Sequence, residues 1–189
     1  MKKVHIAVAI IGLTLGLTSA KADTYAADKT HASVGFRVSH LVISKVRGHF
    51  NEFEAQLEMG DDKKVTGVDA TIQIGSIDTG IAKRDTHLKG ADFFDVENHP
   101  LMTFKSKEVK ADVIVGDLTI RGVTKEVELP YTVLGPVTDP WGNTKLGFEA
   151  AMTINRTDFG VAWNSETETG ALVVGEDVEI EVNMEFAKQ

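Results

Sequence analysis

Alternating apolar and polar side chains run through most of this chain and restrict it to β-strands with one buried face. In residues 51–59 every second side chain is apolar, namely Phe53, Ala55, Leu57 and Met59. A strand points successive side chains to opposite faces, whereas a helix repeats its faces every 3.6 residues. The same pattern predicts about eight strands, near residues 32–40, 51–59, 68–74, 101–109, 112–121, 125–133, 146–154 and 177–186.

Turn residues separate these segments, and one stretch departs from the strand pattern. Short Gly- and Asp-rich connections, such as residues 60–62, predict antiparallel neighbours. Residues 80–89 contain no Pro and are followed by Gly90, which predicts a short helix. Asp78 or Thr79 is a candidate N-cap for it. A loop would then lead to the strand near residue 101.

The distribution of charge predicts a closed barrel with an apolar interior. Glu52, Glu54 and Glu58 share one strand face, which must therefore be in water, and closure removes the exposed sheet edges. The predicted fold is all-β, an extended eight-stranded antiparallel barrel. Such a barrel is either filled by side chains or holds one small ligand. Small inward residues, Ala55 and Ala70 among them, favour a cavity, and a solid core remains the alternative.

The first 22 residues have the organisation of a secretory signal peptide. Lys2 and Lys3 precede an apolar run, and Ala20-Lys21-Ala22 forms a small-x-small cleavage site. We therefore expect a signal peptide over residues 1–22, one domain over residues 23–189, and a periplasmic location. No later stretch reaches the roughly 20 apolar residues of a membrane helix, so no stable membrane anchor is expected.

Composition narrows the class of partner. Removing the signal takes away three of the 20 basic residues and none of the 28 acidic ones, which changes the formal charge from −8 to −11. No nucleic-acid partner is therefore expected, because the acidic chain would be repelled by the phosphates. The chain contains no Cys, so a single hydrophobic core must hold the fold without disulfides.

Residues 83–100 gather many titratable groups, among them Arg84, Asp85 and His87. Catalysis would need a nucleophile and an orienting group beside the Asp-x-His pair, and the sequence offers no motif for either. The two histidines of the stretch lack metal-site spacing, so neither a metal nor a cofactor is expected. The structural interpretation pairs Asp85 with Lys89 on the surface, lets Arg84 bind a strand-end carbonyl or carboxylate, and has Phe93 and Phe94 fill apolar space. The functional interpretation makes the stretch a lid, in which a helix and an aromatic loop cover one end of the barrel and Arg84 lies near a lipid head group.

A second group of charges lies at residues 155–160, NRTDFG. It contains the D-F-G tripeptide of protein kinases, but the other kinase motifs are missing. In an extended segment Arg156 and Asp158 lie on the same side, which predicts a structural ion pair.

Five segments of the chain are informative in combination, namely HASVGFRVSHL (31–41), VRGHFNEFEAQL (46–57), IDTGIAKRDTHLKGADFFDVENHPLMTFKS (77–106), GDLTIRGVTKEVEL (116–129) and GFEAAMTINRTDFG (147–160). Together they resemble the YceI-like family of periplasmic polyisoprenoid-binding proteins, and the resemblance spans essentially the whole mature chain. The resemblance implies a lipocalin-like barrel that holds a long isoprenoid or another amphiphile, with no known enzymatic activity. It leaves the role of Arg84 and His87 open.

The leading hypothesis is therefore an exported carrier of a long-chain lipid, whether isoprenoid, quinone or fatty amide; a homodimer is left open. One alternative is an enzyme that modifies lipid head groups through Asp85 and His87, and another is a solid-core structural or stress barrel. The candidate ligand-binding residues are the inward apolar ones: Val34, Phe36, Val38, Phe53, Leu57, Ile72, Phe104, Leu118, Ile120, Tyr131, Phe148, Met152, Val182 and Met184.

Overall fold

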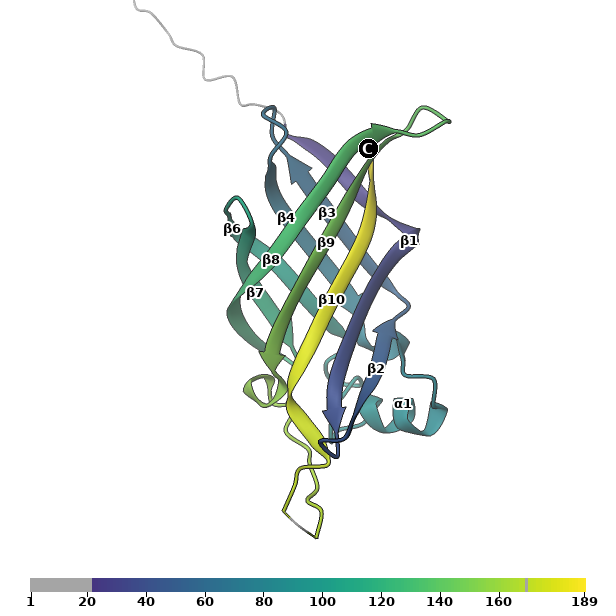
Figure 1. The fold of residues 1–189 in the computed structure, drawn as a ribbon, viewed down its shortest axis with the longest axis vertical. Coiled ribbons are helices and arrows are strands. Elements are labelled where there is room, and N and C mark those ends of the chain that lie inside the picture. The colour runs from purple at the N-terminus through teal and green to yellow at the C-terminus, as the bar shows by residue number, and fades with distance from the viewer. Residues whose placement is uncertain (1–21, 169) are drawn as a thin grey trace, which may run out of the picture.

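The computed structural model describes residues 22–168 and 170–189. The predicted signal peptide therefore lies outside the described residues, except for Ala22. The described chain forms strands, one α-helix and two short 3-10 helices (Figure 1). In chain order these are β1 (Asp23–His40), β2 (Ser44–Phe50), β3 (Phe53–Met59), β4 (Val65–Gln73), η1 (Ile74–Ser76), β5 (Ile77–Asp78), α1 (Ala82–Lys89), β6 (Leu101–Val109), β7 (Val113–Ile120), β8 (Val123–Thr138), β9 (Thr144–Asn155), η2 (Arg156–Phe159) and β10 (Val174–Lys188).

The strands form one antiparallel sheet that closes on itself. Its order is β10-β9-β8-β7-β6-β4-β3-β1-β2-β5, and a further pairing of β10 with β1 completes the ring. β2 and β3 pair with successive parts of β1, because Val34 lies opposite Phe50 and Ala26 lies opposite Gln56. β4 and β5 likewise run along β3 and β2, with η1 between them. The ten segments thus make eight barrel strands, and the predicted eight-stranded barrel is confirmed.

The interior of the barrel is apolar, as the alternation predicts. In β3, Phe53, Ala55, Leu57 and Met59 are buried and the residues between them are exposed. Buried side chains from the strands, together with Phe93, Phe159 and Val161 from the connections, form one hydrophobic cluster. The charged faces lie outside, which is the arrangement that the glutamates of β3 required.

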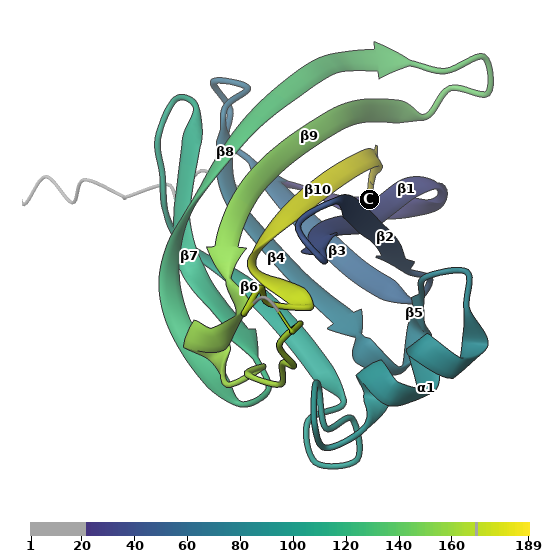
Figure 2. The same ribbon diagram turned by 60° about the horizontal axis from the view of Figure 1, so that its bottom comes forward.

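One end of the barrel carries most of the irregular structure. Helix α1 and the connection from β9 to β10 lie at this end, as does the β1–β2 turn (Figures 1 and 2). The helix falls inside the predicted range of residues 80–89, but neither predicted N-cap residue is correct, because Ile81 is the N-cap and provides no side-chain bond. Gly90 follows the helix as predicted and is its C-cap, with an extended backbone at a φ of −72°. Thr79 instead donates hydrogen bonds from its N–H and its hydroxyl to the Asp85 carboxylate within the helix.

No helix among the described residues has the length and hydrophobicity needed to cross a membrane. The described residues form one closed sheet, and the single domain over residues 23–189 stays a prediction.

Across the outside of the barrel, an ion pair joins β1 to β9 over the intervening β10. Lys145 Nζ lies 2.5 Å from Asp28 Oδ2. The ammonium group holds the pKa of Asp28 well below its usual range, and the hydroxyl and N–H of Thr30 add to this. A carboxyl whose pKa is depressed on folding stabilises the protein above its unfolded pKa, and the contribution is lost as pH falls toward its folded pKa.

We therefore expect Asp28→Asn to make the melting temperature less dependent on pH in the acid range. The melting temperature of the wild type should fall as pH decreases from about 4, because the unfolded chain then takes up a proton that the folded state resists. The variant should start lower at pH 7 and lose less on acidification. Asp61→Asn, in the exposed β3–β4 turn, is the control. Parallel profiles for Asp28→Asn and the wild type would contradict the assignment.

Candidate functional site

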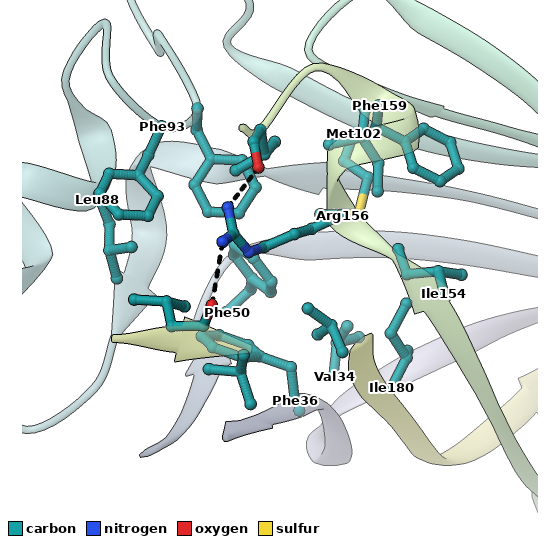
Figure 3. A pocket seen from close by; sticks show the side chains of 17 residues that line it. Val34, Phe36, Phe50, Leu88, Phe93, Met102, Ile154, Arg156, Phe159 and Ile180 are labelled. Atoms are coloured by element: carbon teal, nitrogen blue, oxygen red, sulfur yellow. Dashed lines mark hydrogen bonds between the residues drawn. The ribbon is translucent and has the colours of Figure 1, made fainter. Parts of the chain in front are cut away.

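An apolar cavity lies inside the barrel at the end where α1 and the β9–β10 connection are found (Figure 3). Its volume is about 100 Å³. The lining comes from β1, β2, β6, β7, β9 and β10, from α1 and its following loop, and from η2 with its following residues. The lining residues are Val34, Gly35, Phe36, Val38, Phe50, Leu88, Phe93, Phe94, Met102, Ile120, Ile154, Arg156, Phe159, Val161, Val174, Val178 and Ile180.

Aromatic rings form the wall between the barrel and the loop that follows α1. The ring centroids of Phe36 and Phe50 are 5.8 Å apart, and Phe50 meets Phe94 edge-on at 6.4 Å. Phe93 packs against Trp163 at 5.1 Å. The prediction that Phe93 and Phe94 fill apolar space is confirmed. The wall depends on side chains from a loop, which can change rotamer more easily than residues held in a sheet.

The structure places the fourteen predicted ligand-binding residues in three groups. Four line the cavity: Val34, Phe36, Val38 and Ile120. Seven others are buried in the hydrophobic cluster elsewhere in the barrel: Phe53, Leu57, Ile72, Phe104, Leu118, Phe148 and Met184. The remaining three are partly buried against that cluster: Tyr131, Met152 and Val182. Contact of any of them with a ligand stays a prediction, and the ten outside the lining fill space in this structure.

Sequence reasoning left several cavity residues out of its candidate set. Val178 and Ile180 belong to the apolar face of β10. The alternation pattern identifies them as inward-facing, but it does not tell that they lie at the height of the cavity along the barrel axis. Phe50, Met102 and Ile154 lie at or next to the ends of β2, β6 and β9, and their height along the barrel was likewise unknown from the sequence. Arg156 and Phe159 lie in η2, which has no strand pattern to reveal them.

Arg84 and Asp85 form one network around Thr79. Arg84 Nε donates to the Thr79 hydroxyl oxygen at 2.7 Å, and Nη2 donates to the Thr79 carbonyl oxygen at 2.8 Å. Asp85 accepts from the same threonine, and the predicted Asp85–Lys89 pair is absent from the ion pairs of the described residues. Neither Arg84 nor Asp85 lines the cavity. Their geometry is that of a brace between β5 and α1.

His87 is separate from this network. Its Nε2 lies 3.2 Å from Asp92 Oδ2, and its ring meets Phe93 and Trp163 edge-on at 5.0 and 5.2 Å. Asp85 faces Thr79 instead, so the two residues suggested for head-group chemistry do not converge on a common point. The imidazole supports the aromatic wall from outside.

Arg156 is the one polar side chain in the described lining, and only 6% of it is exposed. The predicted pairing with Asp158 is wrong, because residues 156–159 form a 3-10 helix rather than an extended segment. Asp158 turns outward, with Oδ2 at 3.6 Å from Lys125 Nζ. Arg156 turns inward and donates to backbone carbonyl oxygens of Val161, Trp163, Val174 and Gly175. Burial lowers the pKa of Arg156 below its usual value.

A group of possible metal ligands lies on the outer surface, away from the cavity. Asp28, His31 and Glu185 bring one ligand atom each within 4.8 Å of one another. The Lys145 ammonium group already contacts Asp28 at 2.5 Å and lies 3.9 Å from Glu185. Because this side chain supplies the positive charge that the carboxylates require, we assign no metal to the group.

A closed antiparallel barrel with an apolar cavity at one end defines a lipocalin-like class of protein. A family model for the YceI-like domain matches residues 25–186. The chain belongs to the YceI-like family, as its motifs predict.

The chain is also similar to known proteins in sequence and in three-dimensional structure. A UPF0312 protein of Pectobacterium atrosepticum is 38% identical over 197 aligned positions, which cover 100% of this chain and 99% of that protein. The structure of BcnA from Burkholderia cenocepacia has a TM-score of 0.73 at 24% identity, covering 84% of this chain and 98% of BcnA. A polyisoprenoid-binding domain from Saccharophagus degradans has a TM-score of 0.64 at 12% identity, covering 89% of this chain and 100% of the domain. At these identities the two structures support the fold alone.

Proposed function

We propose that the protein is a carrier that takes the hydrocarbon chain of an amphiphilic lipid into the cavity and shields it from water. The observation that carries this proposal is the lining, in which all side chains except Arg156 are apolar. Transfer of a chain from water to such a lining is favourable by about 25 cal/mol per Å² of apolar surface. No chemical step is included in the proposal, because Asp85 and His87 do not share a site.

An isoprenoid is the first candidate for the chain. The domain from Saccharophagus degradans that shares the fold is described as polyisoprenoid-binding, and the sequence resembles a family with that property. A quinone or a fatty amide carries a comparable apolar chain and would meet the same lining. These ligands differ at the head group, so the lining alone does not select among them.

The size of the cavity sets a condition on binding. A volume of about 100 Å³ is smaller than the ~150 Å³ apolar cavity that is known to admit benzene. A chain of several isoprene units therefore needs more space. We propose that the aromatic wall, above all Phe93 and Phe94 of the loop after α1, moves outward when a ligand enters.

We further propose export to the periplasm. The basic and apolar pattern of residues 1–22 supports this, and it rests on the sequence alone. A carrier that moves lipid through an aqueous compartment would have a clear use there.

The proposal is tested with protein purified from its own host. Native mass spectrometry followed by organic extraction should find about one lipid per chain. After delipidation, calorimetric titration with geranylgeraniol should give one site and a negative heat-capacity change, because apolar surface is buried. A preparation without lipid that also fails to bind geranylgeraniol and hexadecanol would contradict the carrier and favour a solid barrel.

A further inference from the structure

We propose that Arg156 is the head-group site of the cavity, and that it selects amphiphiles with an anionic oxygen head, a carboxylate or a phosphate, over neutral ones. The inference rests on the proposed function, because it assumes that a hydrocarbon chain occupies the surrounding apolar space. It adds the chemical class of the ligand, which the apolar lining leaves undetermined.

The first argument is charge. Arg156 is buried, and it takes part in none of the ion pairs of the described residues. Four neutral carbonyl oxygens surround it, and these satisfy donors without cancelling the positive charge. An uncompensated charge in an apolar environment is costly, which agrees with the lowered pKa of this group. Glu176 acts against this lowering of the Arg156 pKa, but it is exposed and does not line the cavity.

The second argument is the number of donors. A guanidinium has five N–H groups. Nε donates to Gly175 at 2.9 Å, and Nη1 donates to Val161 at 2.5 Å and to Trp163 at 2.9 Å. Nη2 has two N–H groups and a single bond, to Val174, at 3.3 Å, which is beyond the usual range. Among the described residues, Nη2 therefore keeps one donor free and one weakly used.

The third argument is position. Figure 3 shows the guanidinium projecting from η2 into the middle of the lining, toward the side on which Leu88 and Phe93 lie. Those two residues belong to α1 and to the aromatic loop, which we propose to move on ligand entry. A head group that meets Nη2 would thus lie at the helix end, and its chain would extend along Phe36, Ile154 and Ile180 into the barrel. Charge-assisted bonds of this kind are short and strong.

Arg156 also has a structural effect. Its bonds to Val161 and Trp163 on one side, and to Val174 and Gly175 on the other, hold the β9–β10 connection against β10. A loss of stability in an Arg156 variant therefore does not distinguish a head-group site from a brace. The ratio of affinities for an anionic and a neutral ligand with the same chain does distinguish them, because a brace has no reason to change it.

The first experiment uses the unmodified protein. Delipidated protein is titrated with two matched pairs, palmitate against hexadecanol and farnesyl phosphate against farnesol. We expect at least ~10-fold tighter binding of the anionic member in one pair or both, and the pair identifies the head as carboxylate or phosphate. Equal affinities within both pairs would overturn the head-group site and leave the carrier intact. Failure of all four ligands to bind would instead contradict the carrier itself.

The second experiment assigns the preference to Arg156. Arg156→Met should reduce the anionic-to-neutral ratio to about 1 while the folded variant still binds the alcohols, because the cation is removed and the apolar lining remains. Arg84→Met is the matched control, since it removes a cation at the same end of the barrel but outside the lining, and it should keep the wild-type ratio. An Arg156→Met variant that keeps the preference would overturn the assignment.

A measurement without substitution covers the case in which Arg156→Met does not fold. The side-chain ¹⁵N resonances of Arg156 in the wild-type protein should shift when the preferred anionic ligand binds, and should shift much less with its neutral partner. Saturation by the anionic ligand with unchanged Arg156 resonances would overturn the proposal.

Discussion

Ile154→Trp is expected to weaken geranylgeraniol binding by about 100-fold or more, equivalent to roughly 3 kcal/mol. Ile154 lies in β9 with its side chain on the cavity (Figure 3). An indole ring is larger than the side chain it replaces, and the cavity offers only about 100 Å³. The ring would therefore occupy the space in which the ligand begins to bind. Its stability cost should be modest, ~1 to 3 kcal/mol at most, because part of the added volume enters a void.

Val137→Trp controls for the tryptophan itself. Val137 is 60% exposed near the far end of β8, so this variant should bind geranylgeraniol like the wild type. Calorimetric titration of both variants, after circular dichroism has established that each is folded, checks the prediction. Normal binding by a folded Ile154→Trp protein would place the ligand outside the cavity.

Phe186→Ala is expected to lower the free energy of unfolding by ~3 to 5 kcal/mol. Phe186 is fully buried and meets Phe148 edge-to-face at 6.0 Å. It lies in β10 opposite Ala27 of β1 and Leu146 of β9, so it packs where the barrel closes. Such a loss is a large share of the ~5 to 15 kcal/mol that stabilises a typical domain.

Leu134→Ala is the matched control for this truncation. Leu134 is 55% exposed in β8, and its replacement should cost less than ~1 kcal/mol. Urea unfolding monitored by tryptophan fluorescence compares the two variants. A cost below ~1 kcal/mol for Phe186→Ala as well would mean that the closure is loosely packed.

The barrel could be predicted from the sequence because a strand with one buried face has an apolar residue at every second position. The buried set of β3, Phe53 to Met59 in steps of two, is the set that alternation gives. The interruptions within two of the barrel strands were harder to predict from the sequence. Asn51 and Glu52 interrupt β2–β3 and η1 interrupts β4–β5, and these breaks follow from pairing across the sheet rather than from local pattern.

The cavity could be predicted only in part, because alternation tells which side of a strand faces inward and not how far along the barrel a residue lies. Phe36 and Phe148 have the same inward phase, yet Phe36 lines the cavity and Phe148 stacks on Tyr131 in the filled part. The height of each residue depends on strand register and tilt, which are properties of the closed sheet.

The position of the Arg156 side chain also could not be predicted from the strand pattern, because the local backbone is not extended. An extended segment would place it beside Asp158, and this expectation fails because Asn155 Oδ1 accepts hydrogen bonds from Thr157 and starts a 3-10 turn. Gly160 ends the turn with a left-handed backbone, at a φ of 75°. Asn155 and Gly160, which flank this segment, are residues that favour turns, and both are visible in the sequence.

The most direct test of the cavity as the lipid site is an NMR titration of protein labelled with [methyl-¹³C]methionine. Met102 lines the cavity, whereas Met59 is buried in β3, outside the cavity lining. With geranylgeraniol, the Met102 methyl resonance should show the largest shift and saturate at one equivalent, while Met59 stays nearly unchanged. A titration that shifts Met59 and leaves Met102 in place, or that moves neither methyl at saturating lipid, would contradict the account.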